Sequence, residues 1–165
     1  MRKKFLLPAL LLVALLVGGI LWYTRPQSFW EATGMDRDQI TGASGYAIEG
    51  HVTAGQASQQ TWMLNSLTPG QEDYDTLLEL LDGTTYRASL QNFLPSPSSH
   101  TAANVTASVS FALGDDLFLI NADYPGKVWI SSPGHSRILV FSVSPQELNE
   151  TLGDFIQQRG VLDNA

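Results

Sequence analysis

Glu49 and His51 are the two residues of this sequence best placed for acid–base chemistry. They alternate in "YAIEGHVT" (46–53), and Thr53 follows at the same spacing, so a strand would place all three side chains on one face. A carboxylate beside an imidazole can exchange protons with a substrate, which supports a hydrolase as one hypothesis. The same polar residues also suit the solvent side of a half-buried strand. Because the sequence indicates no third group and no pocket, we assign no catalytic residue.

The sequence gives little indication of a metal site and none of thiol chemistry. The three histidines, His51, His100 and His135, lack the helical or hairpin spacing of a zinc site. The chain has no cysteine, which excludes disulfides, thiolate metal sites, a cysteine nucleophile and lipidation at cysteine. We therefore expect no metal site and no cofactor.

Acidic residues occur in three pairs, 36/38, 73/75 and 115/116, which offer oxygen ligands of the kind that calcium prefers. None has the alternating loop and distant glutamate of a calcium hand. A helix N-terminus explains the second pair and a hairpin turn the third, so a weak surface calcium site is the lesser alternative.

Two serines and two tryptophans are further candidate site residues. Ser44 in "GASG" and Ser136 in "GHSR" match no nucleophile motif, and the sequence contains no phosphate-binding glycine loop. Trp62 and Trp129 could stack on sugars or on a partner's side chains, although large aromatic residues mostly fill cores.

The charge distribution is asymmetric. Four of the nine basic residues lie in the first 25 positions, whereas all 16 acidic residues lie beyond them, so the remainder of the chain has a net charge of −11. Nucleic-acid affinity depends on lysine and arginine neutralising phosphates. We therefore expect no nucleic-acid partner.

An apolar segment without charge runs from residue 5 to residue 23. A bilayer core about 30 Å thick is crossed by about 20 such residues, so the segment predicts one transmembrane helix, and residues 1–25 a membrane anchor or uncleaved signal. Trp22 and Tyr23 before Arg25 are typical of a membrane interface. The alternative is a signal peptide cleaved after Gly19.

The predicted orientation follows from the flanking charges. Three basic residues precede the apolar segment and Arg25 alone follows it, which favours a cytoplasmic N-terminus. We expect a single-pass protein of the cell membrane with its C-terminal domain outside.

Residues 26–45 are predicted as a spacer and loop with a short helical turn over 29–33, and residues 46–165 as one domain. In residues 46–53, the alternation predicts a strand that buries Tyr46 and Ile48. A hairpin partner, "QTWMLN", follows. A helix then begins at Thr68 and Pro69 and ends at a left-handed Gly83.

The second half has the clearest periodicity. "NVTASVSFAL" (104–113) alternates strictly and predicts a strand with one buried face. Three more strands follow through Gly114 and two Pro-Gly turns, and "RILVFSV" predicts a strand covered on both faces. Ser144 and Pro145 begin a second helix, which Gly160 ends. The role of the loop at 95–103 stays open.

These elements predict an α+β fold: a mostly antiparallel sheet of about six strands, with two capped helices packed on it and one N-terminal transmembrane helix before it.

The succession of "FWEATGMDRDQITGASGYAIEGHVT", a capped leucine-rich helix, "YRASL", a meander and a final capped helix resembles small uncharacterised membrane-tethered extracytoplasmic domains of Gram-positive bacteria. The resemblance implies a single exported domain and no catalytic residue.

Three hypotheses of function follow. The first is a non-enzymatic domain that binds a protein or small-molecule partner through a concave or edge surface, at the cell envelope. The second is an exported hydrolase that uses Glu49 and His51. The third is an accessory subunit of a membrane complex.

Overall fold

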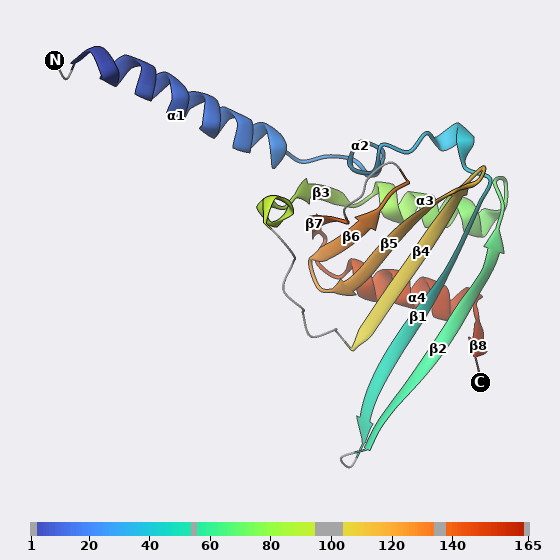
Figure 1. Cartoon of the computed structure of the whole chain (residues 1–165). Helices are drawn as coiled ribbons and strands as arrows, with labels where there is room; N and C mark the ends of the chain where they lie inside the picture. Colours follow the sequence, from blue (N-terminus) through green and yellow to red (C-terminus); the bar gives the residue numbers. More distant parts are fainter. Residues whose placement is uncertain (1–2, 54–55, 95–103, 134–137, 164–165) are drawn as a thin grey trace.

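The protein folds around one large antiparallel sheet. The computed structural model describes residues 3–53, 56–94, 104–133 and 138–163, with side chains for these ranges except 3–7, 51–53 and 56–57. Eight strands pair in the order β3-β7-β6-β5-β4-β1-β2-β8, all antiparallel (Figure 1). The strands are β1 Gly42–Thr53, β2 Gln56–Leu67, β3 Thr85–Ala88, β4 Val105–Leu113, β5 Asp116–Tyr124, β6 Lys127–Ser131, β7 Leu139–Ser144 and β8 Val161–Asp163. The helices are α1 Lys3–Tyr23, α2 Phe29–Thr33, α3 Glu72–Asp82 and α4 Leu148–Arg159, with 3-10 turns η1 Arg37–Gln39 and η2 Leu90–Phe93.

The predicted α+β class is confirmed, but the predicted count of about six strands is wrong. The eighth strand, β8, follows Gly160 at the end of α4 and pairs with residues 61–63 of β2. It has three residues, all exposed, so it lacks the alternation that reveals a strand in sequence. The predicted meander is confirmed as β4 to β7.

Helices α2, α3 and α4 pack on the same face of the sheet and enclose the core with it. The hydroxyl of Tyr86, on β3, donates to the carbonyl of Leu81 at the end of α3 over 3.1 Å. Arg159 of α4 pairs with Asp73 of α3. The two helices are therefore joined to each other as well as to the sheet.

In β1, the structure buries the face opposite to the one we predicted. Ala43 and Ala47 are buried beneath α4, whereas Tyr46 is exposed. The reason is the close approach of α4: a Cβ at Gly153 of α4 would lie 2.5 Å from Val105 Cγ1 of β4, and a Cβ at Gly45 would lie 3.5 Å from Ile156 Cδ1 of α4. Only small residues fit under the helix, so the bulkier side chains of β1 point the other way.

Both core helices begin later than the sequence predicted. Residues 68–71 form a turn with Gly70 at φ +90°, and the Thr68 N–H donates to Gln71 Oε1 over 2.8 Å, so α3 starts at Glu72. Gly83 ends α3 in a right-handed conformation, not the predicted left-handed one.

Residues 26–45 pack against the domain. Ser28 caps α2 through a reciprocal hydrogen-bonding box with Glu31, at the position predicted for a helical turn. Gln27 bridges Tyr86 of β3, and the Phe29 ring is fully buried beside Tyr86 and Phe111. This segment therefore supplies part of the core.

The predicted transmembrane helix over 5–23 is wrong, and with it the signal anchor and the single-pass location with an outer domain. Among the residues that the structure describes, no helix is long and apolar enough to cross a membrane.

Candidate functional site

One face of the sheet is covered by no helix among the described elements over β6, β5, β4, β1 and β2 (Figure 1). We call this surface the open face. At its β7 end, η2 covers Val140, whose backbone N–H and C=O both bond to the Asn92 side chain. Elsewhere on this face, large apolar side chains reach solvent: Tyr46 is 39% exposed, Met63 46% and Leu117 59%.

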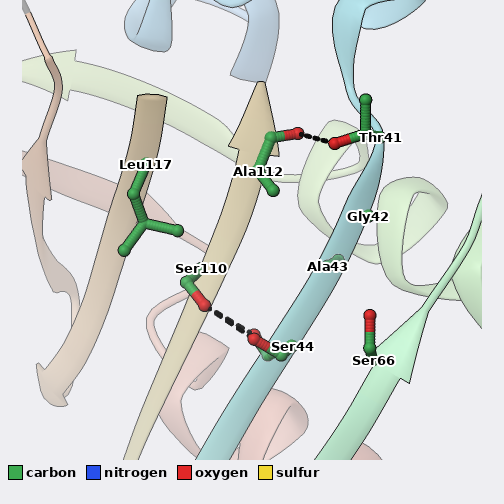
Figure 2. Close-up of a pocket in the computed structure, with 8 residues that line it drawn as sticks. All are labelled: Thr41, Gly42, Ala43, Ser44, Ser66, Ser110, Ala112 and Leu117. Carbon is green, nitrogen blue, oxygen red and sulfur yellow. Dashed lines mark hydrogen bonds between the residues drawn. The ribbon is translucent and has the colours of Figure 1, made fainter. Parts of the chain in front are cut away.

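A hollow of about 180 Å³ lies at the upper end of the open face, between β2, β1, β4 and β5. It forms where β2 carries an extra residue: Ala43 pairs with Leu67 and Gly45 with Leu64, so three steps of β2 match two of β1. Figure 2 shows its lining, which consists of Thr41, Gly42, Ala43, Ser44, Ser66, Ser110, Ala112 and Leu117.

Hydroxyl groups line the floor of the hollow and are held in place by hydrogen bonds. The Ser44 and Ser110 Oγ atoms lie 2.9 Å apart across β1 and β4, and Thr41 Oγ1 donates to the Ala112 carbonyl over 3.1 Å (Figure 2). Farther down β4, Ser108 Oγ donates to Asn121 Oδ1 over 2.7 Å. The floor is therefore polar and fixed, while Leu117 and Ala112 give the rim an apolar part.

The lining of the hollow suits binding better than bond-breaking chemistry. Activation of a serine requires a general base within hydrogen-bond reach. The lining residues carry hydroxyl, methyl and isobutyl groups, and none of them is titratable near neutral pH. A ligand group would be held here by shape and by hydroxyl donors and acceptors.

The residues singled out for acid–base chemistry do not lie at this hollow. Glu49 is partly buried, and its Oε2 accepts a hydrogen bond from Gln157 Nε2 of α4 over 3.2 Å, so its side chain lies on the covered face. The His51 side chain lies outside those described, and so do His100, His135 and Ser136. The hydrolase hypothesis therefore stays a prediction.

Asp36, Asp73 and Trp62, which the sequence also offered as site residues, form hydrogen bonds, an ion pair or packing contacts within the fold. Asp36 accepts from the Asp38 N–H at the start of η1, and Asp73 pairs with Arg159. In the described parts of the chain, no three His, Cys, Asp or Glu side chains gather as a metal site would require. Trp62 packs against the core, and Trp129 is partly buried in β6.

Comparison with known proteins gives no guide to this surface: no family model, no curated protein and no solved structure matches the chain. The predicted resemblance to membrane-tethered domains of Gram-positive bacteria thus rests on the layout of elements in the sequence. Any function has to be argued from the geometry of the domain itself.

Ser44 is the one residue of the hollow that the sequence analysis considered. It was considered as a nucleophile, although its surroundings match no nucleophile motif. The hollow depends on the register shift between β1 and β2 and on small side chains in neighbouring strands. Neither feature has a signature in a single sequence.

One carboxyl group in the sheet has an unusual environment. Asp123, on β5 next to a register irregularity with β6, is partly buried, and this burial raises the pKa of its carboxyl above the ordinary 3.8. The folded state therefore favours the neutral acid more than the unfolded state does. The stability from this group is fully present below its unfolded pKa and is lost as the pH rises through the folded pKa.

We accordingly expect Asp123→Asn to raise the free energy of unfolding at pH 7, by less than about 1 kcal/mol because the group is partly solvated. The gain should disappear at a pH below 3.8. Urea unfolding at both pH values measures it, with Asp154→Asn on the exposed side of α4 as control. If Asp123→Asn instead lowered the free energy of unfolding at pH 7, an interaction in the folded state would have to stabilise the charged carboxylate by more than its burial costs.

Proposed function

We propose that the protein is a non-enzymatic binding domain whose partner lies across the open face of the sheet. The observation that supports this most is the exposure of Tyr46, Met63 and Leu117 on a sheet face that α2, α3 and α4 leave uncovered. Sheets usually place polar side chains on a solvated face. Large apolar side chains there indicate an interaction surface.

The residue types favour a polypeptide as the partner. Tyrosine, tryptophan and methionine are enriched in protein–protein interfaces, and Tyr46, Met63 and Trp129 belong to strands of this face. The hollow would receive one side chain of the partner beside Leu117, and the serine hydroxyls would bond to its polar atoms. Burial in such a pocket is the usual environment of the residues that contribute most to binding.

Cross-linking in the producing cells tests this proposal. A photoreactive amino acid in place of Leu117 should cross-link to one partner, whereas the same group in place of Glu150, on the exposed side of α4, should not. Ser110→Trp fills the hollow and should abolish the product from position 117.

Equal cross-linking from positions 117 and 150 would contradict the proposal, because the contact would then be independent of the face. So would an unchanged product with Ser110→Trp in a variant whose thermal unfolding matches that of the parent.

A further inference from the structure

The four strands that surround the hollow of the open face contain no Lys or Arg. Among the eight described strands, only β3 and β6 contain such a residue, Arg87 and Lys127 respectively. The charged residues of β2, β1, β4 and β5 are acidic: Asp116, Asp123 and Glu49, of which Glu49 lies on the covered face. Around the hollow, the sheet therefore offers negative charge and no Lys or Arg.

Two aspartates adjoin the hollow directly. Asp115 lies in the turn between β4 and β5, and Asp116 is the first residue of β5. The next residue, Leu117, pairs with Ala112, and both line the hollow (Figure 2). The two aspartate side chains are exposed, and neither forms an ion pair with another described residue. Two unpaired carboxylates thus lie beside the place where a side chain of the partner would enter.

Three of the described basic residues of the domain are engaged elsewhere in the fold. Arg159 pairs with Asp73 of α3, and Arg87 donates to the Thr24 carbonyl over 3.4 Å. Arg37 stacks on an aromatic ring of α2, with its guanidinium carbon 5.9 Å from the ring centroid. These side chains are not available to balance the carboxylates beside the hollow.

A partner that covers the open face would remove water from these carboxylates. Burying an ionised carboxylate without a partner is costly, and like charges across an interface disfavour binding. Asp123 on β5 shows the cost within the free domain: it forms no ion pair with the described residues, and its partial burial raises the pKa of its carboxyl. Positive charge on the partner would replace this cost with attraction.

We propose that the partner presents a basic segment to the hollow, with one side chain inserted beside Leu117 and neighbouring Lys or Arg residues paired with Asp115 and Asp116. This inference rests on the proposed function, because it specifies the partner of the same face. Exposed charges at the rim of an interface mainly determine the association rate and the choice of partner. The carboxylates would therefore select basic polypeptides among those with a suitable side chain for the hollow.

The cross-link from position 117 reveals the partner's sequence at this point. A protease that cleaves after acidic residues leaves basic segments intact, and mass spectrometry of the digested product then identifies the joined segment. We expect more Lys and Arg than Asp and Glu within about five residues of the link, which is about 17 Å of extended chain. A neutral or acidic segment would overturn this inference and leave the proposed function standing. The absence of any product from position 117 would overturn both.

A pair of double substitutions tests the role of the carboxylates. In an extract of the producing cells, Asp115→Asn with Asp116→Asn should lower the yield of the product from position 117 about fivefold. Glu150→Gln with Asp154→Asn removes the same charge from the exposed side of α4 and should leave the yield unchanged. Thermal unfolding confirms that both variants fold. Equal yields from the two folded variants would overturn the inference.

Ionic strength separates charge from apolar contact. Raising it in the extract from about 0.1 M to about 1 M shortens the range of charge interactions from about 10 Å to about 3 Å. The yield from position 117 should therefore fall in the parent protein and change little in the Asp115→Asn, Asp116→Asn variant. A parent yield that does not fall with salt would mean that apolar contacts alone hold the partner, against the inference.

Discussion

Phe29→Ala is expected to lower the free energy of unfolding by about 3–5 kcal/mol, the usual cost of removing a buried phenylalanine. The Phe29 ring is fully buried, and its centroid lies 5.0 Å from that of Trp30 and 5.9 Å from those of Tyr86 and Phe111. The substitution would leave a cavity where α2 meets β3 and β4. Urea unfolding, followed by tryptophan fluorescence, measures the loss.

Phe93→Ala is the control for this substitution. The Phe93 ring is exposed and contacts Tyr23 alone among aromatic rings of the described chain, so its removal should cost about 0.5 kcal/mol. If Phe29→Ala cost no more than Phe93→Ala, residues 26–45 would be a spacer, as their composition suggested, and not part of the core.

Gly153→Ala is expected to destabilise the protein by about 1–2 kcal/mol, because overpacking at the site outweighs the better helix propensity of alanine. The new Cβ would lie 2.5 Å from Val105 Cγ1, and valine has little freedom at χ1 to move away. Relief requires α4 to shift from β4. Thermal and urea unfolding both report the change.

A double-mutant cycle isolates the cause of this effect. Val105→Ala removes the obstructing methyl group, so Gly153→Ala in that background should be neutral or stabilising by up to about 1 kcal/mol. An equal loss of stability in both backgrounds would show that the close approach of α4 to β4 is not what requires glycine at position 153.

The regular parts of the fold could be predicted because their side chains alternate in size and polarity. Residues 104–113 alternate strictly, and Ala107, Val109 and Phe111 are indeed buried. The strand "RILVFSV" buries both Val140 and Phe141, as its apolar run predicted, since η2 covers one side and the core the other. At these five positions, the residues that the pattern predicted to be buried are buried.

Elsewhere, the tertiary structure outweighs the pattern. In β1, Tyr46 faces outwards because small residues, Gly45 and Ala47, lie on the face that α4 covers, which a rule based on hydrophobicity cannot anticipate. In the segment before β1, Phe29, Met35 and Ile40 are each buried without any period. A short exposed strand such as β8 has no pattern at all.

The candidate sites were less predictable than the fold. The hollow of the open face needs a register shift between β1 and β2, and its lining joins residues far apart in the sequence, from Thr41 to Leu117. Glu49, the residue that the sequence favoured for chemistry, bonds instead to Gln157 at the covered face. Site geometry here is a property of contacts distant along the chain.

Oxidation of methionine side chains tests most directly whether a partner covers the open face. In the purified protein, Met63, which is 46% exposed, should oxidise much faster than Met35, which is 5% exposed. In the producing cells, we expect the bound partner to slow the oxidation of Met63 nearly to the rate of Met35. A methionine introduced by Glu150→Met on α4 should stay reactive in both settings. Equal reactivity of Met63 in cells and in the purified protein would contradict the proposal.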